Sequence, residues 1–162
     1  METTTRRRLL AALAAVVLVA ALAVIATGQL WLHGQRADDD RADQVREAAD
    51  RAVTAVLSYD YRRLDQGVAD TTPLLTGDAL AQYEEVQRPL ARTAPKLHAV
   101  VSAEVKTSTV LEADDDSARL LLFVDQVSSS RKLTQPQLDQ SRVVVTMQRK
   151  GDDWLVSSLS AI

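Results

Sequence analysis

An uncharged apolar run from Leu9 to Leu32 constrains this chain more than any other feature. A helix rises ~1.5 Å per residue, so these 24 residues reach about 36 Å and can cross a hydrocarbon core of about 30 Å with some tilt. A helix that is apolar on every side does not suit the surface of a soluble domain. The run therefore predicts one transmembrane helix over residues 9–32.

The charges on both flanks of this run predict its orientation. Arg6–Arg8 precede it, and Asp38–Asp40 follow it. Basic flanks remain on the cytoplasmic side of a membrane. We therefore expect residues 1–8 to form a cytoplasmic basic tail and residues 33–44 to form a polar linker on the outer side.

A cleaved signal peptide is the alternative interpretation of the same segment. Ala21-Leu22-Ala23 has the small-x-small form of a cleavage site. Apolar residues continue well past it, and the run exceeds a usual signal core of about 7–15 residues, which favours a retained anchor. Both interpretations place residues 45–162 in an extracytoplasmic domain.

Composition excludes several function classes. The chain has no cysteine, so disulfides, thiolate metal sites and thiol nucleophiles are absent. Residues 36–162 hold 16 basic and 21 acidic side chains. Phosphate binding needs clustered Lys and Arg, so this acidic balance argues against a nucleic-acid partner.

Hydrophobic periodicity predicts helices in the first half of the outer domain. Apolar residues recur at steps of three to four from Val45 to Leu64, with Gly67 as the expected end. Asp78 is the candidate cap of a second helix. Pro89 should kink or end that helix, and Pro95 should end the helical region by Lys96.

The second half of the domain changes to the alternation typical of strands. Strands are expected over 97–111, 118–127, 141–149 and 154–161, with a turn at Asp114–Asp116 and a tight turn at Gly151–Asp153. The segment 118–127 is apolar on both faces, which predicts a central, well-covered strand. No helix separates the strands, so the fold class is α+β, with helices packed on a curved antiparallel sheet of about four strands.

Residues that could carry chemistry are few. The five glycines do not form a phosphate-binding loop, no G-x-S-x-G is present, and two histidines cannot build a His-cluster metal site. We therefore assign no catalytic, cofactor-binding or metal-binding residue, and we expect no enzymatic activity and no cofactor. The triplets Asp38–Asp40 and Asp114–Asp116 lack the spacing of a calcium loop and are expected to be a solvated leader and a turn.

Three groups of residues are candidates for a functional role. The cluster Tyr59–Arg63 is expected at the end of the first helix. Asp60 in this cluster, or His98 outside it, could act as a general base if a pocket surrounded it. Asp125 is the acid within the apolar segment 118–127, and if buried it would need a partner such as Arg119 or Arg142. Trp154 is expected to cap the core.

Three features of the sequence occur together: a single Arg-flanked N-terminal anchor, the segment VLSYDYRRLDQGVADTTPLLTG and the ending SRVVVTMQRKGDDWLVSSL. Together they resemble the Mce-associated membrane proteins of actinobacteria, which are similar to nuclear-transport-factor-2-like (NTF2-like) and VirB8-like domains. The matching residues are Tyr59, Asp60, Tyr61, Leu64, Asp65, Leu74, Leu75, Thr76, Gly77, Arg142, Val143, Val145, Gly151, Trp154, Leu155 and Val156. Asp152-Asp153 lengthen the turn before the tryptophan relative to that pattern.

The resemblance implies a cone-shaped NTF2-like outer domain and a non-enzymatic accessory subunit of an Mce-type lipid or sterol transport complex. Its partners would be Mce subunits or a permease, and the protein could also form a homo-oligomer.

Two alternative functions remain. One is a VirB8-like secretion component. The other is a small ligand-binding protein or isomerase that uses the cone as a pocket, with Asp60, Asp125, Tyr59 or His98 as its polar groups.

Overall fold

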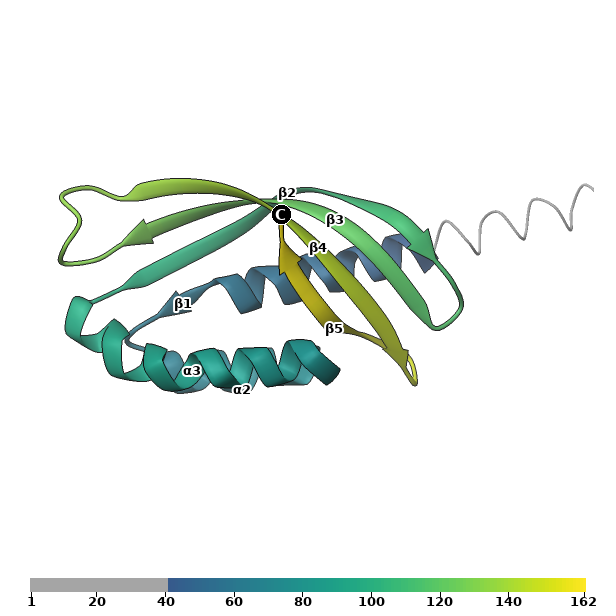
Figure 1. Ribbon diagram of the computed structural model, residues 1–162, viewed down its shortest axis with the longest axis horizontal. Helices are drawn as coiled ribbons and strands as arrows, with labels where there is room; N and C mark the ends of the chain where they lie inside the picture. The colour runs from purple at the N-terminus through teal and green to yellow at the C-terminus, as the bar shows by residue number, and fades with distance from the viewer. Residues whose placement is uncertain (1–40) are drawn as a thin grey trace, which may run out of the picture. The chain divides into compact units, whose positions relative to one another are not determined.

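A curved antiparallel sheet carries the helices on one of its faces (Figure 1). The computed structural model describes residues 41–162, so the predicted basic tail, the span 9–32 and nearly all of the linker lie outside the described residues. Within residues 41–162, no helix has both the length and the apolar character needed to cross a bilayer. Residues 42–162 form one compact unit, the expected α+β domain.

The helix over residues 41–57, called here the leading helix, lies under the concave face of the sheet (Figure 1). Its apolar residues recur at steps of three to four, which places them on one stripe facing the sheet. The buried members of that stripe are Val45, Ala48, Ala49, Ala52 and Val53. Three of the five are alanines, and their small side chains let the helix backbone lie close to the strands.

Two further helices and a short 3-10 turn follow the leading helix. They are α2 (Leu64–Thr71), η1 (Thr72–Leu74) and α3 (Gly77–Leu97). Five strands form the sheet in the order in which they occur along the chain, each antiparallel to the next. They are β1 (Tyr59–Asp60), β2 (Val100–Ala113), β3 (Ser117–Ser129), β4 (Gln137–Lys150) and β5 (Asp153–Ala161).

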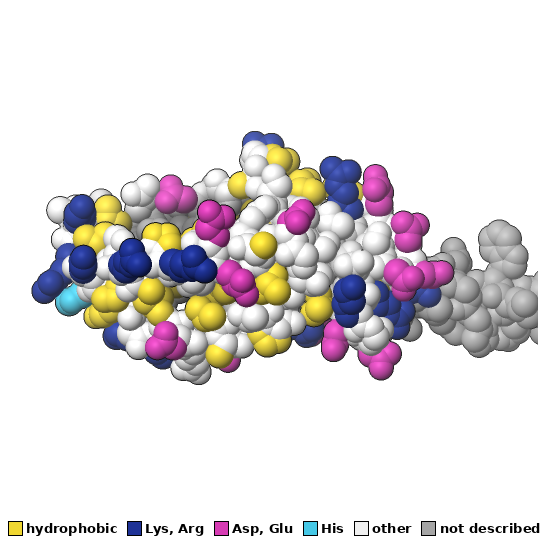
Figure 2. Space-filling view, turned by 60° about the horizontal axis from the view of Figure 1, so that its bottom comes forward, with side chains coloured by type: hydrophobic (Ala, Val, Ile, Leu, Met, Phe, Trp, Pro, Cys, Tyr) yellow, Lys and Arg dark blue, Asp and Glu magenta, His cyan; other side chains and the backbone are white. Residues whose placement is uncertain are grey.

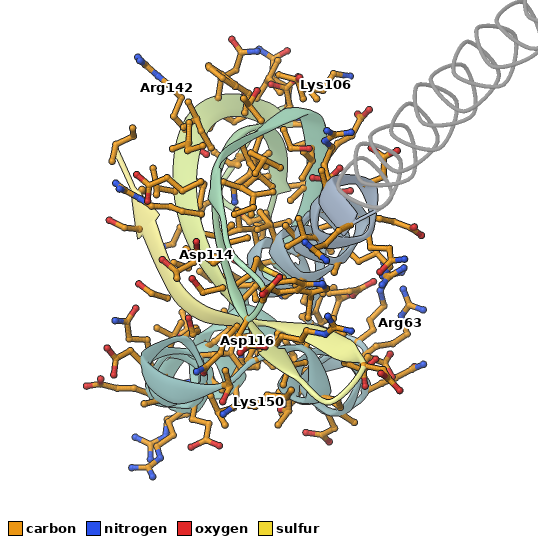
Figure 3. All side chains as sticks on the ribbon, turned by 90° about the vertical axis from the view of Figure 1, so that its right-hand side faces the viewer. Arg63, Lys106, Asp114, Asp116, Arg142 and Lys150 are labelled. Atoms are coloured by element: carbon orange, nitrogen blue, oxygen red, sulfur yellow. The ribbon has the colours of Figure 1, made fainter. Side chains whose placement is uncertain are left out.

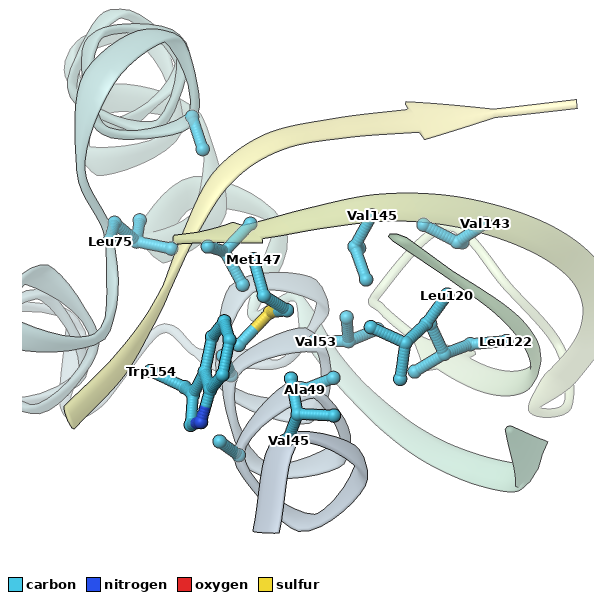
Figure 4. Packing of buried hydrophobic residues seen from close by; sticks show 14 of the residues in the cluster. Val45, Ala49, Val53, Leu75, Leu120, Leu122, Val143, Val145, Met147 and Trp154 are labelled. Carbon is cyan, nitrogen blue, oxygen red and sulfur yellow. The ribbon is translucent and has the colours of Figure 1, made fainter. Parts of the chain in front are cut away.

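The core lies between the leading helix and the inner face of β3, β4 and β5 (Figure 4). Alternate residues of the strands point into it, as the period-two pattern predicts. The fully buried ones include Leu120, Leu122, Val143, Val145 and Met147. Trp154 is 8 % exposed and packs in the same cluster, so its predicted position at the core is confirmed.

The predicted first helix is wrong in its second half. The leading helix ends at residue 57, and Tyr59–Asp60 form a two-residue strand paired with Val100–Val101. This short strand makes the sheet five-stranded rather than about four-stranded. Gly67 does not end a helix but lies inside α2, where nothing is within 4 Å of an added Cβ.

The predictions for α3 also need correction. Pro89 lies inside the helix, which continues to Leu97, one residue beyond the predicted end. Each internal proline removes one backbone hydrogen bond, yet the buried Tyr83 and Ala94 hold the helix on both sides of Pro89. The N-cap is Thr76, and Asp78 lies in the first turn.

The segment 118–127 is central, as predicted, but only one of its faces is covered. Ala118, Leu120, Leu122 and Val124 are buried, whereas Phe123 is 41 % exposed on the outer face. The helices cover only the inner face of the sheet. The apolar residues on the outer face of segment 118–127 therefore do not indicate that this face is covered. β4 begins at Gln137, four residues before the predicted start.

Asp60 shapes the turn from β1 to α2. Its Oδ1 accepts hydrogen bonds from the Arg62 backbone N–H and from Arg62 Nε, both at 2.9 Å. Its Oδ2 accepts from Arg62 Nη2 at 2.9 Å. A carboxylate that accepts from the backbone two residues on forms an Asx-turn, which here directs the chain out of the sheet.

Replacing a core leucine should cost far more stability than the same replacement on the outer surface. Leu120 is 0 % exposed, so Leu120→Ala should lower the free energy of unfolding by about 2–5 kcal/mol. Leu111 is 47 % exposed on β2, and Leu111→Ala should cost less than about 1 kcal/mol. Urea unfolding of the purified full-length variants measures both, and equal losses would contradict this core.

The stabilising effect of Asp60 should depend on pH. The side-chain hydrogen bond from Arg62, with its backbone hydrogen bond, lowers the pKa of Asp60 from its ordinary value of 3.8. A group whose pKa is lower in the folded state stabilises the fold above its unfolded pKa, and loses that effect as the pH falls through the folded value.

Wild type should therefore resist urea better than Asp60→Asn at about pH 6, and the difference should shrink as the pH falls below the ordinary aspartate value. Urea midpoints of both proteins across this range provide the measurement. A difference that stays constant down to about pH 2 would show that ionised Asp60 does not contribute.

Candidate functional site

An open groove of about 380 Å³ separates α3 from the part of the sheet that the leading helix does not reach. Its apolar lining comes from three places: the end of the leading helix, one side of α3, and the strands. These residues include Val56, Leu57, Tyr83, Val86, Leu90 and Leu159. A concave, mainly apolar surface with a few polar groups is the usual form of a binding site.

The floor of the groove is fixed by the end of the leading helix. Gln126 Nε2 on β3 donates to the Leu57 carbonyl oxygen at 3.4 Å, and Ser58 Oγ accepts from the Ala103 backbone N–H on β2 at 2.9 Å. Both contacts satisfy groups at the point where the helix stops. They hold the chain against the sheet and leave the space beyond residue 58 open.

The wall formed by α3 is amphipathic. Ala79, Tyr83, Val86 and Leu90 recur at steps of three to four on the groove side, and Val86 is 58 % exposed. On another side of α3, the exposed Arg88, Arg92 and Lys96 follow one another at four-residue steps. Figure 2 shows this row of Lys and Arg side chains with exposed hydrophobic side chains on both sides of it.

Polar groups enter the groove from the strands and from α3. They include Tyr59, Gln82, Gln87, Gln126, Ser128 and Asp139. Among the described residues that line the groove, Asp139 alone carries a charge. Its Oδ1 accepts a hydrogen bond from Gln137 Nε2 at 3.1 Å, and the residue is exposed.

The cluster Tyr59–Arg63 is divided between two environments. Tyr59 lines the groove, whereas the Asp60 carboxylate turns to Arg62. Arg62 lowers the pKa of Asp60, so this carboxylate stays ionised and is a weak proton acceptor near neutral pH. The Asp60 carboxylate is thus bonded within the turn, and Asp60 lines a separate open depression rather than the groove.

His98 is the C-cap of α3 and lies outside β2, although the sequence predicts a strand over 97–111. It has a left-handed backbone with φ of 49°, and its ring stacks on Tyr61 with 4.8 Å between the ring centroids. The Arg62 guanidinium lies 5.5 Å from the Tyr61 ring centroid. These contacts join the β1–α2 turn to the end of α3, outside the groove lining.

Asp125 lies on the outer face of the sheet, away from the core and the groove. Its Oδ1 accepts a hydrogen bond from Gln140 Nε2 on β4 at 2.8 Å. Within the described residues, Asp125 forms no ion pair with Arg119 or Arg142. Arg119 instead pairs with Glu112 at 4.0 Å. Figure 3 shows Arg142 and Lys106 projecting from the side of the sheet opposite α2 and α3.

Asp114–Asp116 form the turn between β2 and β3, as predicted. The Asp116 carbonyl oxygen accepts from the Arg149 N–H at 2.9 Å, which ties this turn to the end of β4. Within the described residues, no group of three or more His, Cys, Asp or Glu is arranged to hold a metal ion. Asp38–Asp40 lie outside the described residues.

Of the residues that the sequence suggested for chemistry (Tyr59, Asp60, His98 and Asp125), only Tyr59 lines this groove. Asp60, Asp125 and His98 do not line it, and Asp60 instead lines a separate open depression of about 370 Å³ together with Tyr59. Asp139 was missed. The groove-side stripe of α3 was visible in its sequence spacing, but the pairing of 137–140 with β3 was hidden in a segment that looked like a polar loop.

No protein-family model matches this chain. Two curated proteins of Mycobacterium tuberculosis, the uncharacterised MT1407 of strain CDC 1551 and Rv1362c of strain H37Rv, are 32 % identical to it over 142 residues. The match covers 85 % of this chain and 64 % of those proteins, so the chain spans less than two thirds of their length. Neither name assigns a function, and the Mce-associated resemblance therefore stays a prediction.

Solved structures show which fold this is. An IcmL-like type IV secretion system protein of Legionella pneumophila aligns with a TM-score of 0.62 and 17 % identity, over 74 % of this chain and 91 % of that one. The periplasmic domain of DotI gives 0.60 and 15 %, over 73 % and 92 %. The VirB8 protein of Agrobacterium tumefaciens gives 0.59 and 10 %, over 74 % and 90 %. The domain thus has the α+β fold of VirB8-like and NTF2-like periplasmic domains.

Proposed function

We propose that this protein is a non-enzymatic scaffold subunit of an envelope-spanning transport assembly, of the VirB8-like kind. One helix over residues 9–32 would anchor it, with the N-terminus in the cytoplasm and the domain outside. The groove beside α3 would hold a partner protein. The observation that carries the proposal is this open, largely apolar groove on a domain whose fold is shared with secretion-system periplasmic domains.

The character of the groove supports binding rather than catalysis. A catalytic acid or base works at neutral pH when apolar walls shield it from water. Asp139 is exposed and already bonded by Gln137. Tyr59 and Tyr83 offer hydroxyl groups, but the carboxylates considered for proton transfer, Asp60 and Asp125, lie elsewhere.

A finer proposal concerns the cargo of the assembly. Residues of the Mce-like pattern occupy structural positions: Gly151 turns β4 into β5 with φ of 65°, and Val156 bridges to Leu75. The pattern is therefore a signature of architecture, which the secretion-type neighbours share. Their likeness supports a VirB8-like secretion role more than a specific role in Mce-type lipid or sterol transport, and co-purified partners decide between the two.

A charge placed in the groove should release the partner. Val86 is 58 % exposed on the groove wall, so Val86→Asp would put a carboxylate against an apolar interface. Recovery of partner proteins with the full-length protein, cross-linked in cells and purified in mild detergent, should fall at least about tenfold, equivalent to about 1.4 kcal/mol. Ala81→Asp introduces the same charge at an exposed α3 position that does not line the groove, and should leave recovery unchanged.

The identity of the recovered proteins tests the two proposals separately. Secretion ATPases and channel subunits would support the VirB8-like role. A permease with Mce subunits would support lipid or sterol transport instead. Recovery of this protein alone, with both variants showing unchanged urea midpoints, would contradict a scaffold function.

A further inference from the structure

β5 covers only part of the strand it pairs with. β3 pairs with β4 from Gln137 to Gln148, whereas β5 pairs with β4 only from Val143 to Lys150. Beyond β5, the Ile162 N–H donates to the Arg142 carbonyl oxygen at 3.0 Å. Within residues 41–162, nothing pairs with residues 137–141 of β4 on the side where β5 would continue, and this stretch is called the open edge of β4.

The alternation of an antiparallel strand identifies the free groups on this edge. The backbone N–H and C=O of one residue point to the same neighbouring strand, and those of the next residue point to the other. Arg142 bonds toward β5, so Gln140 and Leu138 point to the same, open side. No described residue bonds to their backbone groups on that side.

The open edge adjoins the groove described above. Asp139, between Leu138 and Gln140, lines the groove together with Leu159 of β5. Leu138 points to the outer face and is 58 % exposed. An unpaired edge of this kind, next to an apolar depression, is what strand addition requires: backbone groups supply affinity, and alternate side chains supply specificity.

We propose that an extended segment of a partner protein adds to the open edge of β4 as a further strand, antiparallel to β4 and in line with β5. Its backbone bonds to Leu138 and Gln140. Its inward side chains fill the groove, with a Lys or Arg opposite the carboxylate of Asp139. This inference rests on the proposed scaffold function and names how the partner is held.

The charge of Asp139 distinguishes a partner from a second copy of this chain. A two-fold antiparallel pair centred on this edge would place Asp139 directly opposite the Asp139 of the other copy. Like charges in directly opposed positions destabilise a strand pair, while opposite charges stabilise it. The edge thus fits a segment that carries a cation at this position.

A short peptide provides the probe. The acetylated and amidated peptide Thr-Lys-Val-Val-Thr places Lys opposite Asp139 and its second Val on the groove side when it lies antiparallel to β4, and it leaves the place opposite Arg142 to Ile162. It should bind the full-length protein in detergent and slow hydrogen exchange at the amides of Leu138 and Gln140. The same peptide with Glu in place of Lys should bind about tenfold more weakly.

Proline variants test the backbone bonds themselves. Gln140→Pro and Leu138→Pro each remove one outward N–H without removing a bond to β3, and proline is tolerated on edge strands. Each should weaken peptide binding about tenfold. Gln140→Ala and Leu138→Ala keep the N–H and are the matched controls. Ala161→Pro changes an edge position of β5 and should leave binding unchanged.

Several results would overturn the proposal. They are no peptide binding at millimolar concentration, equal binding by the proline and alanine variants, and a wild-type dimer that Gln140→Pro converts to a monomer. If partners still co-purify through the groove while the peptide does not bind, strand addition fails and the scaffold function stands. If the peptide binds as described while nothing co-purifies, the scaffold function fails and the edge remains a strand-binding site.

Discussion

The packing of the leading helix against the concave face of the sheet determines the rest of this domain. Ala48, Ala49 and Ala52 bring the helix close to the strands, so a single helix excludes water from the side chains of β3 and β4. Burial of apolar surface at about 25 cal/mol per Å² is the main stabilising contribution available to a chain that has no cysteine and therefore no disulfide.

The groove forms because the leading helix and β5 are too short to cover the whole inner face of the sheet. The leading helix stops at residue 57, β5 stops short of the beginning of β4, and α3 packs mainly against β5. One part of the inner face is therefore filled, and the other is left as a groove beside an open strand edge. A protein that exposes both features must either protect them or use them, because an unpaired edge favours association with another chain. Leu138 on the open edge and Val86 on the groove wall are both 58 % exposed, so apolar side chains remain accessible at both features.

The elements with strong periodicity were predictable from the sequence, and the short ones were not. The buried stripe of the leading helix, the alternation of Val143, Val145 and Met147, and the Gly151 turn each follow a local pattern, and all three are confirmed. Tyr59–Asp60 was placed in a helix because two residues cannot display alternation, and their pairing with β2 depends on contacts distant in sequence. Pro89 was expected to disturb a helix that tertiary contacts at Tyr83 and Ala94 keep continuous.

The candidate site was less predictable for the same reason. Asp139 and Val86 are separated by more than fifty residues, and neither belongs to a motif; only the fold brings both to one groove. Asp60, His98 and Asp125 were selected from the sequence because their side chains can transfer protons. In the structure these side chains contact residues near them and lie outside the groove. Asp60 shapes a turn, His98 ends a helix and stacks on Tyr61, and Asp125 bonds across two strands.

Site-specific photocross-linking in cells shows whether the uncovered part of the inner face holds a partner protein. A photoreactive phenylalanine analogue would replace Val86 on the groove wall, and Ala81 on another side of the same helix, in the full-length protein. We expect a discrete cross-linked protein from position 86 and none from position 81. Equal cross-linking at both positions, or no protein cross-link from position 86, would contradict this expectation.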